Sequence, residues 1–148
     1  MAELYSLDTN VYIRALRVRE SMLALRGFLL RVGTRLRMNA VVAQELRASA
    51  ITPAHEDAVD ELLGAYARRE RVIVPSFGAH VEAGRVLAAL HRSEGVQLSR
   101  AGSLVNDVLL ATSCREASVC LVTDNVSDFA AAQRHLRGFR YVPTAEVM

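Results

Sequence analysis

Apolar runs alternate with amphipathic stretches along most of the chain, and their spacing predicts alternating strands and helices. Short strands are expected at residues 3–7, 36–39, 72–75, 119–123 and 140–142. Helices are expected at residues 11–16, 21–32, 40–50, 55–69, 77–91, 104–116 and 129–136. Such alternation predicts an α/β fold: a three-layer α/β/α sandwich around a central, mainly parallel sheet of four to five strands.

Two aspartates directly follow predicted strands. Asp8 comes after the first strand, and Asp124 comes after the strand at 119–123, which has the strongest strand pattern in the chain. Ligands of an open parallel sheet bind outside the carboxyl ends of its strands. We therefore expect these two carboxylates to lie at the same rim of the sheet, although they are far apart in sequence.

A third aspartate lies in an unusually apolar helix. Asn106 and Asp107 are the only polar residues between Leu104 and Ala111. A helix that is apolar nearly all round is buried, and a buried carboxylate needs a hydrogen bond, an ion pair or a metal. The alternative is that Asp107 caps or breaks the start of the helix. Glu45, in the middle of another helix, is ordinary by its local context and expected to face solvent.

The composition places these carboxylates in a globular protein. The chain has 148 residues, of which 51% are hydrophobic and 23% are charged, so a single domain spanning 1–148 is expected. No apolar run approaches the roughly 18 residues of a membrane span, and the start lacks a basic signal-peptide region. Two cysteines form no disulfide framework. A cytoplasmic protein without membrane contact is the expectation.

All 18 basic residues are arginines. The absence of lysine argues against P-loop phosphate binding and Schiff-base chemistry. Residues 1–50 contain eight arginines against four acids, whereas residues 51–148 contain ten arginines against twelve acids. The basic first third could face a phosphate backbone, or it could simply form solvated helix faces.

Carboxylates gathered at one rim repel each other, and a hard divalent cation removes that penalty. Magnesium prefers oxygen ligands and retains several waters. Such a site can activate water and stabilise the leaving oxygen of a phosphodiester. The four histidines are scattered without a pair at i and i+4, so a zinc site is not expected.

Four segments together resemble the motifs of PIN-domain nucleases, and more narrowly those of VapC-type toxins of toxin–antitoxin modules. They occur in the family's order and span essentially the whole chain. They are Leu-Asp-Thr-Asn-Val-Tyr-Ile at 7–13, Val-Val-Ala-Gln-Glu-Leu at 41–46, Asn-Asp-Val-Leu-Leu-Ala-Thr at 106–112, and Leu-Val-Thr-Asp-Asn-Val-Ser-Asp-Phe at 121–129.

The resemblance implies a PIN-like fold in which Asp8, Glu45 and Asp107 hold Mg²⁺, or Mn²⁺, together with an acid of the fourth motif. Asn125 stands where many relatives carry an acid, which leaves Asp124 and Asp128 as candidates. Asp124 is favoured because it follows the strand directly. Asp128 either reaches the metal through water or caps a helix that begins at Phe129. Supporting or substrate-binding roles are expected for Thr9, Asn10, Asn106, Asn125 and Arg100.

The function that the resemblance implies is a magnesium-dependent endoribonuclease, the toxin of a type II toxin–antitoxin pair. Its partners would be an RNA substrate, a cognate antitoxin and a second copy in a homodimer. Part of the stripe Met22, Leu25, Phe28 and Leu29 is either core or a groove for the antitoxin's helix. Two alternatives are a catalytically silent PIN-like binding module and, less favoured, an aspartyl-phosphate phosphatase. The phosphatase is less favoured because this chain has no lysine and has Asn10 where such enzymes usually have a second aspartate.

Overall fold

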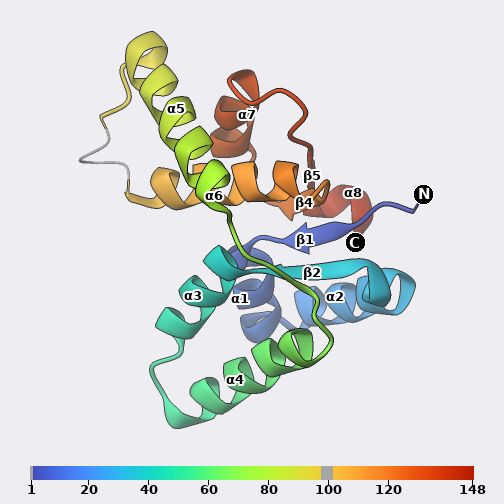
Figure 1. Cartoon of the computed structure of the whole chain (residues 1–148). Coiled ribbons are helices and arrows are strands. Elements are labelled where there is room, and N and C mark those ends of the chain that lie inside the picture. Colours follow the sequence, from blue (N-terminus) through green and yellow to red (C-terminus); the bar gives the residue numbers. More distant parts are fainter. Residues whose placement is uncertain (1, 98–101) are drawn as a thin grey trace.

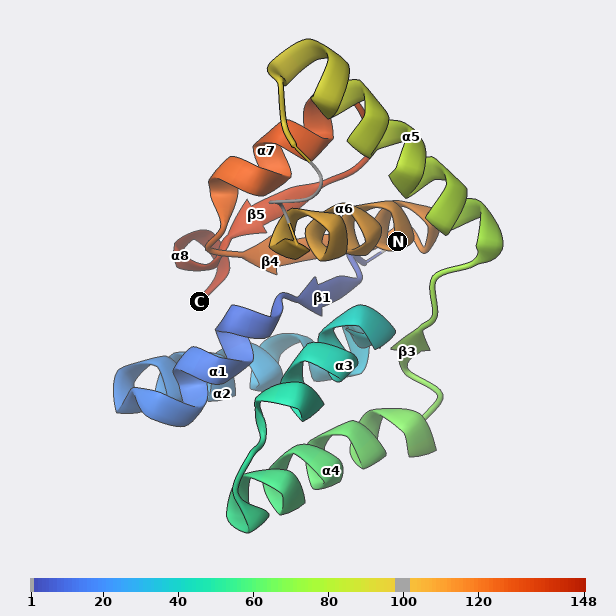
Figure 2. The same cartoon turned by 90° about the vertical axis from the view of Figure 1, so that its left-hand side faces the viewer.

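The computed structural model describes residues 2–97 and 102–148. Five parallel strands form one sheet in the order β3-β2-β1-β4-β5 (Figures 1 and 2). Their bounds are β1 Tyr5–Leu7, β2 Leu36–Asn39, β3 Val72–Ile73, β4 Cys120–Thr123 and β5 Tyr141–Pro143. The α/β class and the parallel sheet that the sequence predicts are thereby confirmed.

Helices cover both faces of this sheet. Helices α1 to α4 lie on one side and α5 to α7 on the other (Figures 1 and 2). The chain first moves outward from β1 to β3, then returns to β4, so right-handed crossovers place the later helices on the opposite face. The bounds are α1 Thr9–Arg17, α2 Arg19–Val32, α3 Ala40–Ser49, α4 Pro53–Arg68, α5 Phe77–Glu94, α6 Gly102–Glu116, α7 Val126–Arg134 and α8 Thr144–Val147, with a 3-10 turn η1 at Gly33–Arg35.

Polar residues at the strand ends start the helices that follow. Asp8 is the N-cap of α1, and its side chain accepts a hydrogen bond from the Thr9 amide. Asn39, the last residue of β2, caps α3 in the same way through the Val41 amide. Such side chains satisfy backbone donors that the first helical turn leaves free. The capping residues thus fix where α1 and α3 leave the rim of the sheet.

The core lies between the sheet and its two helical layers. All four residues of β4 are buried, as expected for a parallel strand covered on both faces. Helix α6 is buried along most of residues 107–114, including Val108, Leu110 and Ala111, and packs against both the sheet and α5. Among the described helices, none combines the length and the apolar character that crossing a membrane requires.

The clearest difference from the sequence-based expectation is at α7. This helix begins at Val126 rather than at Phe129, and Asn125 is its N-cap. Asp128 therefore lies inside the first turn and does not cap the helix. The Asn125 side chain makes no capping hydrogen bond, and its amide nitrogen donates to the carboxylates of Asp107 and Asp128. Helix α8 was not expected, since four residues are too few to show a helical period.

Candidate active site

Asp8 lies at the carboxyl end of β1 and is only 4% exposed. One carboxylate oxygen accepts the Thr9 amide at 2.8 Å, and the other accepts the Thr123 hydroxyl at 2.7 Å. Thr123 ends β4, the neighbouring strand, and its hydroxyl also accepts the Asn125 amide at 2.9 Å. Two adjacent strand ends thus fix the orientation of Asp8.

Glu45 reaches the same region from α3. Its Oε1 accepts a hydrogen bond of 2.8 Å from the Thr9 hydroxyl. Thr9 therefore contacts two carboxylates, donating its amide to Asp8 and its hydroxyl to Glu45. Glu45 is half-buried, not solvated as its local sequence alone suggests.

Asp107 approaches from α6 and is 8% exposed, as the apolar residues around it predict. Its Oδ2 accepts a hydrogen bond of 3.0 Å from the Asn125 side-chain amide. The same amide nitrogen donates to Asp128 at 3.1 Å. Asn125 therefore holds the carboxylates of Asp107 and Asp128 next to each other.

These side chains meet in a pocket of about 290 Å³ at the rim of the sheet. It is lined by Asp8, Thr9, Asn10, Ile13, Glu45, Ser103, Asp107 and Asn125. Because the strands are parallel and their ends coincide, residues separated by a hundred positions in sequence line one hollow. Figure 2 views the molecule from the side toward which the strands run.

The pocket disfavours the ionised form of the carboxylates that line it. Burial is the main cause that raises the pKa of Asp107 to about 8, and the charges of Asp8, Asp128 and Glu45 add to it. Burial also raises the pKa of Asp8, although hydrogen bonds from Thr123 and Thr9 act in the opposite direction. A buried set of carboxylates with raised pKa values is stabilised by a positive charge, and such perturbation is typical of functional sites.

The pocket offers the kind of ligand that a hard divalent cation prefers, because every candidate ligand atom is a carboxylate, amide or hydroxyl oxygen. Among residues 2–97 and 102–148, no three His, Cys, Asp or Glu side chains already stand close enough to share one ion. Glu45 is held by Thr9, and Asp107 by Asn125. Magnesium retains several waters, which can bridge ligands spaced in this way.

The remaining predicted residues lie around this pocket in different ways. Asp124 faces a neighbouring pocket, where its Oδ2 accepts a hydrogen bond of 2.8 Å from Arg14 Nη1. Asn10 lines both pockets, whereas half-buried Asn106 lines neither. Arg100 lies outside the described residues. The fold thus brings together Asp8, Glu45 and Asp107, with Asp128 beside Asp107 and Asp124 turned toward α1.

Two supporting residues were missed by the sequence reasoning. Thr123 orients Asp8, and Asn39 caps α3 while donating to the Ser113 hydroxyl of α6 at 2.7 Å. Asn39 is completely buried, as is Thr123. The available signal was their position: each is a polar residue that ends an apolar strand, at the rim where Asp8 lies.

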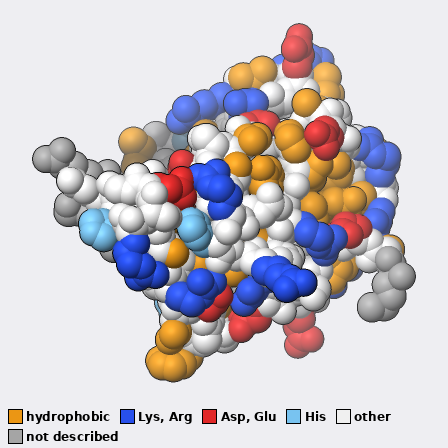
Figure 3. Space-filling model, turned by 90° about the horizontal axis from the view of Figure 1, so that it is seen from above, with side chains coloured by type: hydrophobic (Ala, Val, Ile, Leu, Met, Phe, Trp, Pro, Cys, Tyr) orange, Lys and Arg blue, Asp and Glu red, His pale blue; other side chains and the backbone are white. Residues whose placement is uncertain are grey.

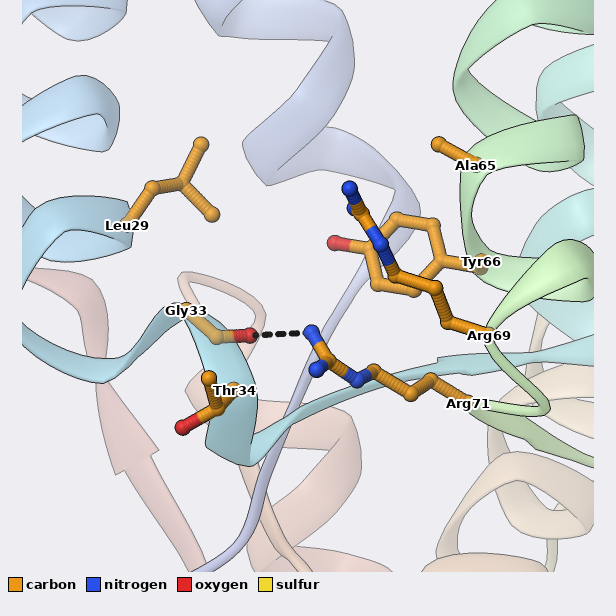
Figure 4. A pocket seen from close by; sticks show the side chains of 7 residues that line it. All are labelled: Leu29, Gly33, Thr34, Ala65, Tyr66, Arg69 and Arg71. Atoms are coloured by element: carbon orange, nitrogen blue, oxygen red, sulfur yellow. Dashed lines mark hydrogen bonds between the residues drawn. The ribbon is translucent and has the colours of Figure 1, made fainter.

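A second, apolar hollow lies away from the carboxylates, between α1, α2, α3 and α4. Its volume is about 210 Å³, and Leu25, Leu46 and Val59 form part of its wall. Leu29 and Tyr66 also line the adjoining pocket of about 470 Å³. Figure 4 shows Arg69 and Arg71 extending into that pocket, with Arg71 donating to the Gly33 carbonyl oxygen. Apolar and basic surfaces are therefore continuous on this side.

Comparison with known families supports the resemblance seen in the sequence. The family model described as PIN domain matches residues 5–135. No curated protein matches the chain by sequence.

Solved structures match the fold over nearly the whole chain. A DNA-bound VapBC from Salmonella typhimurium has a TM-score of 0.69 at 18% identity, covering 97% of this chain and 99% of its own. A VapBC2 from Rickettsia felis, bound to a promoter DNA fragment, has a TM-score of 0.65 at 18% identity, covering 95% and 98%. FitAcB from Neisseria gonorrhoeae has a TM-score of 0.67 at 17% identity, covering 96% and 99%.

Proposed function

This chain belongs to the PIN domain family, and on that premise we propose that it is a magnesium-dependent endoribonuclease that acts as the toxin of a type II toxin–antitoxin pair. One observation carries the catalytic part of the proposal. Asp8 directly follows β1, and Glu45 and Asp107 lie in α3 and α6, yet all three line one pocket at the rim of the parallel sheet. Oxygen ligands gathered in this way favour a hard cation.

The residues that would hold Mg²⁺, or Mn²⁺, are Asp8, Glu45 and Asp107, with a fourth acid. For that fourth position the geometry favours Asp128 over Asp124. Asp128 shares the Asn125 amide with Asp107, whereas Asp124 is bonded to Arg14. A divalent cation bound there would neutralise the carboxylates and activate water for attack on a phosphodiester.

The chain's own residues orient that site. Thr9 and Thr123 fix Asp8 by hydrogen bonds to both of its oxygens, and Thr9 also holds Glu45. Partners that hold a ligating carboxylate limit its motion and thereby support metal affinity and activity. Asn125 plays the same part for Asp107 and Asp128.

The partner is proposed to be an antitoxin whose amphipathic helix occupies the apolar hollow between α1 and α4. Support comes from the similar folds of chains in VapBC and FitAB complexes and from the mainly apolar walls of that hollow. An apolar helix face that fits into such a groove is a common mode of peptide recognition. A homodimer is also proposed, for which exposed Phe77 and Val81, one turn apart on α5, supply an apolar surface.

The test is cleavage of single-stranded RNA by the purified protein with and without Mg²⁺, beside an identical DNA oligonucleotide. Asp8→Asn should reduce the rate by at least about a hundredfold, because an amide is a far weaker ligand than a carboxylate. RNA cleavage by Asp8→Asn at the wild-type rate would refute the site. Titration calorimetry that detects no Mg²⁺ or Mn²⁺ binding would favour the silent binding module. Hydrolysis of small phosphoesters would favour the phosphatase.

A further inference from the structure

One face of α1 connects the carboxylate pocket to a basic surface. Asn10, Ile13, Arg14 and Arg17 follow each other at helical spacing, and we call them the α1 stripe. Asn10, Arg14 and Arg17 are exposed, whereas the opposite face of the helix is buried. From its first to its last member the stripe covers about 10 Å, since a helix rises about 1.5 Å per residue.

The α1 stripe lines a pocket of about 480 Å³ that adjoins the carboxylate pocket. The two pockets share Asn10, Ile13 and Asn125. The additional polar groups of the second pocket are Arg14, Arg17 and Asp124. A polynucleotide strand whose phosphate sits at the carboxylates can therefore place a neighbouring phosphate beside the two arginines.

Arg17 of this pocket differs from the arginines on the α5 and α7 side. There, Arg85 pairs with Glu82 and Arg134 pairs with Glu94, and Figure 3 shows basic and acidic side chains interspersed on that face. Arg17 makes no ion pair with any residue in the described ranges. Charge-assisted hydrogen bonds from arginine suit phosphate oxygens.

Arg14 forms an ion pair with Asp124, but an RNA phosphate can replace that carboxylate. The bond from Arg14 Nη1 to Asp124 Oδ2 is 2.8 Å long, and the two side chains are 55% and 28% exposed. Exposed ion pairs are weakly held, because water and salt screen them. A phosphate with two oxygens available can take the place of Asp124.

From these contacts we infer that Arg14 and Arg17 bind an RNA phosphate next to the one that is cleaved, and that Asp124 competes with the RNA for Arg14. The inference rests on the proposed ribonuclease function and adds to it the residues that hold the strand. Arg14 and Arg17 contact substrate, whereas Asp124 acts through Arg14 and is a regulator of substrate affinity.

The experiment measures binding of a fluorescein-labelled single-stranded RNA by anisotropy, with Mg²⁺, across a series of salt concentrations. Glu45→Gln serves as the background in which cleavage is silenced. Arg14→Gln and Arg17→Gln should each weaken binding severalfold. Each should also reduce the slope of log affinity against log salt, and the two reductions together should amount to about 0.7, the value for one phosphate contact on a single strand. Arg134→Gln, on the far helical layer, is the matched control and should change neither quantity.

Asp124→Asn discriminates the inference from the alternative role of Asp124. If Asp124 competes with RNA, this variant binds RNA severalfold more tightly and still cleaves it, with a lower KM. If Asp124 is a metal ligand, the same variant loses Mg²⁺ affinity and cleavage, and the inference is overturned.

Unchanged salt slopes for Arg14→Gln and Arg17→Gln, in a protein whose wild type cleaves RNA, would also overturn it while leaving the proposed function intact. A wild type that cleaves no RNA would instead remove the proposed function and the inference with it.

Discussion

Replacing Asp107 by asparagine should stabilise the metal-free protein at neutral pH while abolishing its activity. Burial and neighbouring carboxylates raise the pKa of Asp107 to about 8. Its carboxyl group accepts the Asn125 amide at 3.0 Å, and an asparagine carbonyl oxygen can accept the same bond. The substitution therefore removes an ionisable group from an unfavourable position without deleting its hydrogen-bond partner.

The sign of the effect follows from the two states of the carboxyl group. In the unfolded chain it ionises near pH 3.9, whereas in the folded protein it retains its proton until about pH 8. The unfolded state thus loses a proton that the native state keeps, so stability falls as pH rises between these two values. One pKa unit corresponds to about 1.4 kcal/mol, so from about pH 5.5 to about pH 7.5 the wild type should lose about 2 to 3 kcal/mol relative to Asp107→Asn.

Urea unfolding in EDTA at these two pH values measures the difference. The four histidines are common to both proteins, so any contribution from them cancels in the comparison. Asp57→Asn, at an exposed position of α4, serves as the matched control and should keep the wild-type pH dependence. Adding Mg²⁺ should restore stability to the wild type near pH 7.5 and have little effect on Asp107→Asn. Equal pH dependence in the wild type and Asp107→Asn would refute the reasoning.

Three further predictions concern the site and the core. Thr123→Val should lower the rate of RNA cleavage by roughly tenfold to a hundredfold through loss of the 2.7 Å bond to Asp8, and a wild-type rate would contradict that positioning role. Removing divalent metal with EDTA should stop RNA cleavage. Mg²⁺ or Mn²⁺ should restore it, but Ca²⁺ should not, because Ca²⁺ binds in looser geometry. Cleavage that persists in EDTA would contradict the metal dependence. Leu46 is 1% exposed, so Leu46→Ala should lower the free energy of unfolding in urea by about 2 to 5 kcal/mol. Leu30 is 89% exposed, and Leu30→Ala should lower it little. Similar losses for both would show that Leu46 is not in a packed core.

Sequence patterns predicted best the strands and helices that are buried along most of their length. The strand at 119–123 and the helix at 104–116 were expected within two residues of their observed ends, because both lie in the middle of the core and carry an uninterrupted apolar signal. The start of α7 was misplaced by three residues. Asp128 reads locally as a capping residue, but its carboxylate accepts a hydrogen bond from the Asn125 side chain inside the carboxylate cluster, a contact that only the folded chain creates.

Local sequence could not assign the site residues to one pocket or separate their roles. Glu45 looked solvent-exposed in its own helix, and its contact with Thr9 joins residues 36 positions apart. The opposite orientations of Asp124 and Asp128 depend on Arg14 and Asn125, which approach from different elements. Such directions are set by packing between elements, and no periodicity within one element encodes them.

The alternation of strands and helices, the parallel sheet and the position of Asp8 at its rim could all be predicted from the order of the residues. These features depend on the pattern of apolar residues within each segment and on the common direction of parallel strands, both of which can be inferred from the linear sequence. The hydrogen bonds of Thr9 and Thr123 to Asp8, of Asn125 to Asp107 and Asp128, and of Arg14 to Asp124 could be seen only in the folded chain. Hydrogen bonds between distant side chains depend on distances of a few tenths of an ångström, and only the packing of the finished fold sets them.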